Sequence, residues 1–280
     1  MKKIIKSFLR TKHSLFFKRA VSSLNKQIAE EQRESDEMLD QIHEDGIVRL
    51  GMFMGMRLPP LPSSPVNYPM LIGSYEEEVQ TVLDRLIRKD YKEILDIGCA
   101  EGYYAVGLAL KTSAQIYAYD TDRSILEVCR IVAKENGVEN RISFEDICTS
   151  EKLANFKFTN GLVISDCEGY EKELFTQESV KNLVDCDLVI ELHEFVNRDI
   201  QDKLVSLFSA THACSIVTSD NYFKHITRDP KKYRHVLGNM NHDIKMKALH
   251  EARQEPMGWL VCERDEKKAA YSSSNEKEHA

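Results

Sequence analysis

Two apolar stretches of this 280-residue chain each end in polar side chains that are two residues apart. The stretch GLVIS is followed by Asp166 and Glu168, and the stretch DLVIEL contains Glu191 and is followed by His193. Residues two apart in an extended chain share a face. If the stretches are neighbouring parallel strands, all four side chains meet at the carboxyl edge of one sheet, where open α/β sheets bind ligands.

These four residues are the candidate catalytic group. Such a cluster can take a proton from a hydroxyl group that acts as a nucleophile. His193 is the natural candidate base because imidazole titrates near neutral pH, and Asp166 is the alternative base or orients the hydroxyl. Asp166, Glu191 and His193 are also of the types that ligate Mg²⁺ or Mn²⁺. The structural alternative is that Asp166 and Glu168 are turn and helix-cap residues and that His193 is a satisfied structural histidine.

A glycine turn stands earlier in the chain. Residues 93–109 read EILDIGCAEGYYAVGLA, which predicts a strand, a glycine turn and a helix. Gly98 permits a sharp turn because no Cβ is in the way, and Gly102 permits a ligand to approach the backbone at the helix N-terminus. Asp96 is expected at the carboxyl end of the strand. The dinucleotide fingerprint G-x-G-x-x-G is absent from this turn.

A second strand is predicted over Gln115–Tyr119, and Asp120 follows it. An acidic residue in that place can accept hydrogen bonds from both hydroxyls of a ribose. The alternative is that Asp120 or Asp122 caps the next helix. Because two aspartates are present, one can cap the helix while the other binds the ligand.

Strand and helix patterns alternate through the rest of the chain, as a parallel α/β sheet requires. About forty residues before the last strand, rich in His, Arg, Lys, Tyr and Asn, are predicted to cover the working edge of the sheet and contact a substrate. The further strands are expected over Ile142–Glu145, Gly161–Ser165, Asp187–Leu192, Cys214–Thr218 and Gly258–Glu263.

The glycine turn resembles motif I of the class I S-adenosylmethionine-dependent methyltransferases. The resemblance implies a Rossmann-like, seven-stranded, mostly parallel sheet with helices on both faces, and a last strand that is antiparallel beside the sixth. It implies that Asp96 and the two glycines hold the methionine half of S-adenosylmethionine, and that acids after the second and third strands meet the ribose and the adenine. The residues assigned to the cofactor in this way are Tyr75, Asp96, Gly98, Cys99, Gly102, Asp120 and Asp146.

A narrower resemblance rests on the polar strand ends. The pattern D-x-E-G-x-E after the fourth predicted strand and the E-x-H ending of the fifth are similar to FkbM-type methyltransferases, over roughly Tyr91–Glu194. This implies O-methylation of a hydroxyl on a small molecule or glycan. N-methylation of a protein or other acceptor is disfavoured because the N-P-P-Y or D-P-P-Y signature is missing. The rival functions are an NAD-type oxidoreductase and a non-catalytic partner-binding protein that kept the fold.

Charge and cysteine content limit the partners and the compartment. The net charge is −7, but the first twenty residues carry +7 and the remainder −14. A body this acidic does not suit nucleic-acid binding, so no nucleic-acid partner is expected. The basic N-terminus suits peripheral membrane contact, and a homodimer is also open. Seven dispersed cysteines without a C-x-x-C pair predict reduced thiols in a cytoplasmic protein.

The predicted domain organisation has three parts. Residues 1–69 hold the basic N-terminus, a long helix and a Pro-rich linker, residues 70–264 form the methyltransferase domain, and residues 265–280 are a disordered tail. Ser74 and Glu77 are predicted to form a capping box at the first helix of the domain.

Overall fold

The computed structural model describes residues 22–60 (without 25, 28, 31, 32, 35 and 36), 68–218, 233–238, 242–251 and 257–265. The predicted basic membrane-contact segment, residues 61–67 of the predicted Pro-rich linker, much of the predicted substrate cover before the last strand, and the C-terminal tail after Asp265 lie outside these residues. Within them, no helix combines the length and the apolar character that crossing a membrane needs. All seven cysteines are described, and all are free thiols.

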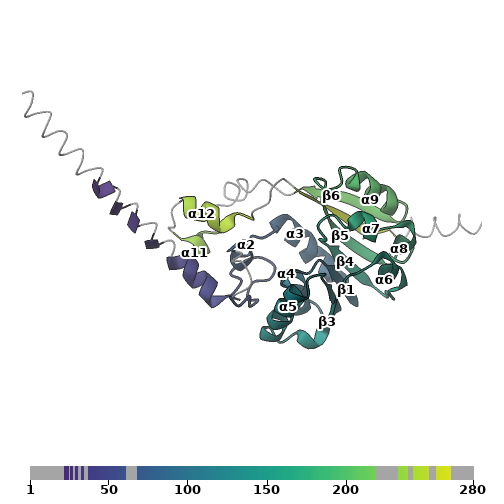
Figure 1. Cartoon of the computed structure of the whole chain (residues 1–280), viewed down its shortest axis with the longest axis horizontal. Coiled ribbons are helices and arrows are strands. Elements are labelled where there is room, and N and C mark those ends of the chain that lie inside the picture. Colours follow the sequence, from purple (N-terminus) through teal and green to yellow (C-terminus); the bar gives the residue numbers. More distant parts are fainter. Residues whose placement is uncertain are drawn as a thin grey trace, which may run out of the picture.

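A seven-stranded sheet forms the centre of the domain, with strand order β3-β2-β1-β4-β5-β7-β6 (Figure 1). The pairs among β1 to β5 are parallel, and β7 is antiparallel to both β5 and β6. The Rossmann-like prediction is therefore confirmed. The strands are β1 (Glu93–Ile97), β2 (Gln115–Tyr119), β3 (Ile142–Glu145), β4 (Gly161–Ser165), β5 (Cys186–Leu192), β6 (His212–Thr218) and β7 (Gly258–Arg264).

Helices cover both faces of this sheet. Two short 3₁₀ turns span Ile87–Lys89 and Glu139–Arg141. The α-helices among the described residues include α2 (Tyr68–Ile72), α3 (Glu77–Leu86), α4 (Tyr103–Lys111), α5 (Arg123–Glu135), α6 (Ser150–Asn155), α7 (Glu171–Leu174), α8 (Gln177–Lys181), α9 (Ile200–Phe208), α11 (Arg234–Leu237) and α12 (His242–Leu249).

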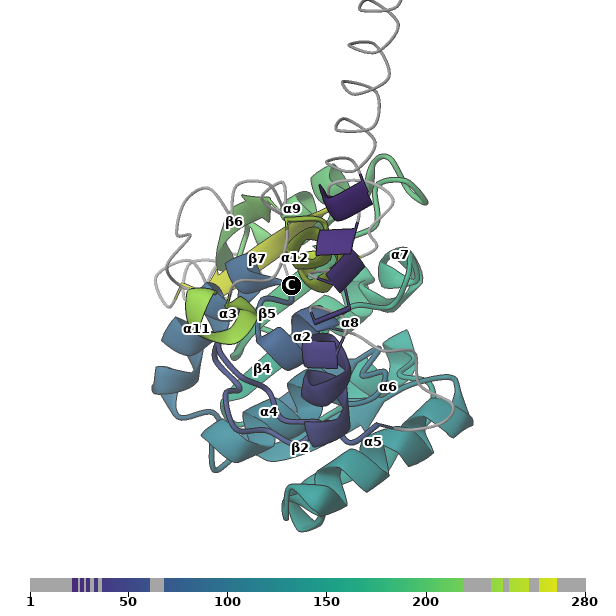
Figure 2. The same cartoon turned by 90° about the vertical axis from the view of Figure 1, so that its left-hand side faces the viewer.

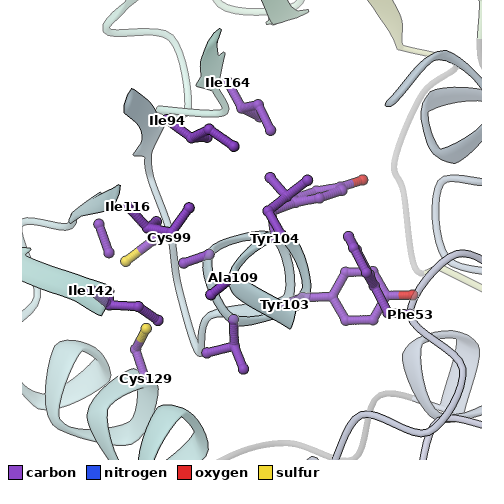
Figure 3. Close-up of a cluster of buried hydrophobic side chains, with 14 of the residues drawn as sticks. Phe53, Ile94, Cys99, Tyr103, Tyr104, Ala109, Ile116, Cys129, Ile142 and Ile164 are labelled. Carbon is purple, nitrogen blue, oxygen red and sulfur yellow. The ribbon is translucent and has the colours of Figure 1, made fainter. Parts of the chain in front are cut away.

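The side chains of alternate strand residues contribute to two separate hydrophobic cores, one on each face of the sheet. On one face, Ile94, Ile116 and Ile164 pack against α3, α4 and α5, and Figure 3 shows these three side chains around α4. On the other face, Leu95 and Val163 pack with the helices α6 to α9. Because the central strands are buried on both sides, their sequences are continuous apolar runs, and this is why their bounds could be predicted closely.

The N-terminal region packs against the domain in two places. Phe53 lies in the core of the α4 face, where its ring meets Tyr103 edge-on with the centroids 5.1 Å apart. The described helical residues that end at Asp45 contribute Leu39 and Ile42 to a third cluster with α2, α11 and α12. Figures 1 and 2 show these helices together at one end of the domain. The division between residues 69 and 70 stays a prediction.

The predicted capping box is wrong. Glu76 precedes α3 in a left-handed conformation with φ 48°, and no side chain caps the helix from that position. The Ser74 hydroxyl lies 3.5 Å from the carbonyl oxygen of Pro69, in α2, and cannot serve the first turn of α3. Instead, the carboxylate of Glu251 accepts a hydrogen bond of 3.0 Å from the Glu76 N–H. A residue 175 positions away in the chain therefore satisfies this end of α3.

Candidate active site

A cavity of about 470 Å³ lies at the carboxyl ends of the parallel strands. This size falls within the range of about 300–1,000 Å³ that is usual for small-ligand sites. It opens where β1 lies between β2 and β4, the point at which the strand order reverses. The walls come from Gly98 and Ala100 after β1, Asp120 and Thr121 after β2, Ile147 and Cys148 after β3, and Asp166, Cys167, Glu168 and Tyr170 after β4, together with Ile97 and Tyr119.

The turn after β1 depends on glycine at position 98. Gly98 has φ +88°, and a Cβ there would lie 1.7 Å from the carbonyl oxygen of Asp166. Its N–H donates to the carbonyl of Tyr119 at 2.9 Å, which ties the turn to β2. Ala100, two residues on, also has a positive φ of 43°. The backbone of this turn thus forms one wall of the cavity, and the conformation of Ala100 was not predicted.

Gly102 and Cys99 have a structural explanation. A Cβ on Gly102 would lie 2.5 Å from Sγ of Cys129, so glycine is needed where α4 packs closely against α5. The Cys99 side chain is buried in the same cluster beside Cys129 (Figure 3). Neither residue is among those that line the cavity. Their contact with a cofactor stays a prediction.

Of the two aspartates after β2, one caps the next helix and the other lines the cavity, which settles the alternative that the sequence left open. Asp122 caps α5 by accepting a hydrogen bond of 2.8 Å from the Ser124 N–H. Asp120 lines the cavity, and its carboxylate accepts from the N–H of Ala100 at 3.0 Å. Asp146 instead forms an exposed ion pair with Lys152 at 2.8 Å, and the hydrogen bond that its carboxylate accepts from Lys152 holds the pKa of Asp146 below its usual value.

Asp96 and Tyr75 are not among the residues that line the cavity, although Asp96 directly precedes the lining residues Ile97 and Gly98. Asp96 is 2% exposed, and its Oδ2 atom has no hydrogen-bond partner among the described residues. Burial raises the pKa of Asp96 to about 7, against the opposing effect of a hydrogen bond from the Ala105 N–H. Tyr75 packs its ring edge-on against Tyr103 with the centroids 5.4 Å apart. Its contact with a cofactor stays a prediction.

The polar ends of β4 and β5 do converge, because these strands pair in parallel. Nε2 of His193 lies 3.4 Å from Asp166 Oδ1, 3.6 Å from Glu168 Oε2 and 3.5 Å from Glu191 Oε2. Exposure differs sharply within the group: the side chains of His193 and Glu191 are 1% and 3% exposed, while those of Asp166 and Glu168 are 27% and 82% exposed. Only the two more exposed members line the cavity.

Glu171 is a member of this group that the sequence analysis did not assign. It is fully buried, and its Oε1 atom lies 2.7 Å from Nδ1 of His193. Burial by itself would lower the pKa of His193, but the hydrogen bond to Glu171 and the neighbouring carboxylates outweigh burial and raise it. The pKa of Glu171 is correspondingly lowered, again against burial. The sequence feature that could have identified Glu171 is its place as the last acid of the D-x-E-G-x-E pattern.

Comparisons with known proteins identify the domain. A family described as methyltransferase domain matches residues 88–272. The chain is 32% identical over 81 residues to methyltransferase GfsG of Streptomyces halstedii, a match that spans 29% of this chain and 29% of that protein.

Two solved methyltransferase structures resemble this chain with a lower sequence identity than GfsG does. The O-methyltransferase TomG from Streptomyces achromogenes, in complex with SAM, has 14% identity and a TM-score of 0.47, with 82% of this chain and 90% of that chain covered. A SAM-dependent methyltransferase from Geobacter sulfurreducens, in complex with S-adenosyl-L-homocysteine, has 15% identity and a TM-score of 0.43, with 71% and 93% covered.

The family match covers all seven strands of the sheet and every residue that lines the cavity. The chain therefore belongs to the methyltransferase-domain family, and its domain is of the class I S-adenosylmethionine-dependent type.

Proposed function

We propose that this protein transfers the methyl group of S-adenosylmethionine to a hydroxyl oxygen of a small molecule or glycan. The observation that carries the proposal is the position of Asp166, which lines the cavity and also contacts the buried group formed by Glu191 and His193. A cofactor in the cavity would lie beside a cluster suited to accept a proton. The D-x-E-G-x-E and E-x-H patterns that form this cluster are those of the FkbM-type resemblance, which favours hydroxyl acceptors.

The residues present fit the cofactor. Gly98 lines the cavity with backbone alone, and Asp120 offers its carboxylate at the end of β2. We assign the ribose hydroxyls to Asp120 and the methionine ammonium to Asp96, whose buried Oδ2 atom has no hydrogen-bond partner among the described residues. Asp146 remains the candidate for the adenine, although Ile147 and Cys148 are the residues after β3 that line the cavity.

The acceptor must meet the methyl group in line and lose its proton as the new bond forms. We assign proton acceptance to Asp166, because it is the acid that reaches both the cavity and the buried group. His193 is a positioning residue in this proposal, since its Nε2 atom is buried out of reach of a substrate in the cavity. Glu171 fixes the orientation of the ring through Nδ1.

Membership of a methyltransferase family argues against the nicotinamide oxidoreductase considered from the sequence. A nitrogen acceptor is the second candidate, disfavoured by the missing amino-methylation signature. A non-catalytic protein with this fold would bind cofactor without turning it over.

Removing the Asp120 carboxylate tests the cofactor assignment. Calorimetric titration of the wild type with S-adenosylhomocysteine should give micromolar binding, about −8 kcal/mol. Asp120→Ala should weaken it by about 10- to 100-fold, because hydrogen bonds to a charged group contribute about 1.5–3 kcal/mol.

Asp122→Ala is the matched control. It removes the cap of α5 and should reduce the free energy of unfolding by about 1 kcal/mol without changing the affinity for S-adenosylhomocysteine. No binding by the folded wild type would overturn the proposed function, and equal weakening in both variants would overturn the role of Asp120.

The raised pKa of Asp96 predicts that cofactor binding depends on pH. With a pKa of about 7, the carboxyl is largely neutral at pH 6, and its ionised form is the one that pairs with an ammonium group. Affinity should therefore fall by up to about tenfold for each pH unit below 7 and level off above it. The stability of the cofactor-free protein depends on pH in the opposite direction. Because folding raises the pKa of Asp96, this group adds to the free energy of unfolding below its unfolded pKa, and that contribution is lost as the pH rises through 7.

Titrations at pH 6 and pH 8, in buffers of different ionisation enthalpy, measure the protons released on binding. Nearly one proton is expected at pH 6 and almost none at pH 8. Asp96→Asn should bind more weakly and lose this pH dependence. A wild type whose affinity is the same at both pH values would contradict the pairing of Asp96 with the ammonium.

A further inference from the structure

The starting point is the environment of His193. Its side chain is 1% exposed, and its Nε2 atom has no hydrogen-bond partner among the described residues. That atom lies near three carboxylates, with 3.4 Å to Asp166 Oδ1, 3.5 Å to Glu191 Oε2 and 3.6 Å to Oε2 of the exposed Glu168. Leaving a buried nitrogen without a partner is costly, so something is expected to bind there.

The spacing of these atoms suits a metal ion. One ligand atom each from Asp166, Glu191 and His193 lies within 4.8 Å of the other two. Ligands at about 2.1 Å around an octahedral ion are about 3.0 Å apart when adjacent and about 4.2 Å apart when opposite. The observed separations therefore need only a small contraction around an ion. Two of the three side chains are buried, unlike an ordinary surface cluster of acids.

Glu171 supplies the outer contact that metal-binding histidines commonly have. Its carboxylate lies 2.7 Å from Nδ1 of His193 and is itself fully buried. A carboxylate in this position keeps the proton on Nδ1 and leaves the lone pair of Nε2 directed at the two acids. A carboxylate that binds the imidazole of a metal-binding histidine in this way recurs in metalloproteins.

We propose that Asp166, Glu191 and His193 bind one divalent cation and that Mn²⁺ fits better than Mg²⁺. Carboxylates suit both ions, but the imidazole nitrogen favours the softer transition metal. The catalytic meaning of the site rests on the proposed function: an ion held by these three residues would contact Asp166, the one ligand that also lines the cavity, and would lower the pKa of an acceptor hydroxyl bound beside Asp166. The rival account is a proton on Nε2, which makes an imidazolium among carboxylates.

Titration of the full chain with MnCl₂ after removal of metal by EDTA tests the site. The concentration of free Mn²⁺ is measured from its electron paramagnetic resonance signal, because protein-bound Mn²⁺ does not contribute to that signal. The wild type should bind one Mn²⁺ per chain, and excess Mg²⁺ should displace it only at much higher concentration. Glu191→Gln should weaken binding by at least about tenfold, the loss usual even for an outer partner of a metal ligand.

Glu194→Gln is the matched control, since Glu194 is an exposed acid next to His193 in the chain. It should bind Mn²⁺ as the wild type does. If Glu191→Gln fails to fold, Asp166→Asn replaces it, because that side chain is partly exposed and better tolerates substitution. Absence of saturable Mn²⁺ binding, or binding unchanged by both ligand variants, overturns the metal site.

Titration with S-adenosylhomocysteine on the same samples separates the two proposals. Folded protein that binds S-adenosylhomocysteine but not Mn²⁺ retains the proposed function and loses the metal site. Protein that binds Mn²⁺ through these residues but not S-adenosylhomocysteine retains the metal site and loses the proposed function.

Discussion

Gly98→Ala is expected to reduce the free energy of unfolding by about 4 kcal/mol or more and to abolish binding of S-adenosylhomocysteine. The new Cβ would lie 1.7 Å from the carbonyl oxygen of Asp166, and neither backbone can move without disturbing the pairing of β1 with β4. The positive φ of 88° adds strain for any residue with a side chain. Urea unfolding followed by circular dichroism gives the loss of stability, and calorimetry gives the loss of binding.

Gly137→Ala separates the cost of left-handed backbone strain from the cost of a steric clash. Gly137 has φ +69°, but a Cβ there would meet nothing within 4 Å. Its replacement should cost only about 1–2 kcal/mol, the penalty of the left-handed conformation, and should leave S-adenosylhomocysteine binding intact. If Gly98→Ala costs no more than Gly137→Ala, the close approach of the two strand ends is not what requires glycine at position 98.

Asp166→Asn is expected to lower kcat by about 10²- to 10⁴-fold, the usual contribution of a positioned general base. The amide has nearly the shape of the carboxylate but cannot accept the proton of the acceptor hydroxyl. The affinity for S-adenosylhomocysteine should stay unchanged, because the cofactor is assigned to other residues. The measurement is the release of S-adenosylhomocysteine with whichever member of a panel of glycosides and hydroxylated small molecules the wild type methylates.

The exposed Glu194 again provides the control for charge, since Glu194→Gln removes one negative charge near the cluster and should keep kcat at the wild-type value. An Asp166→Asn protein with wild-type kcat would rule out Asp166 as the base. A variant that loses cofactor affinity together with kcat would show that Asp166 acts by holding the site together.

The alternation of strands and helices was accessible from the sequence because each strand leaves a strong local signal. Strands buried on both faces are continuous apolar runs, and each is followed by a polar or glycine-containing turn. β2 and β4 therefore stand at the predicted residues, whereas β6 begins two residues earlier than predicted, at His212. That strand lies at the edge of the sheet and is only partly buried, so its apolar signal is weaker.

Parts of the site were predictable for the same reason. Asp120, Asp166 and His193 stand at strand ends, and the parallel order of the sheet brings strand ends to one edge. The capping box failed because Ser74 and Glu77 have the right spacing but Glu76 between them is left-handed. A four-residue sequence pattern does not reveal that conformation, and the Glu76 N–H donates instead to the distant Glu251.

The sequence by itself determined the order of the elements, the glycine turn after β1 and the identity of the acids that end the central strands. Only the tertiary structure decided which of these groups are buried and what they meet. Gly102 faces Cys129, His193 is enclosed, and Glu171 reaches its Nδ1 atom. Periodicity and turn chemistry are local properties of the chain, whereas burial and contact depend on how separate elements cross, and no single segment encodes that crossing.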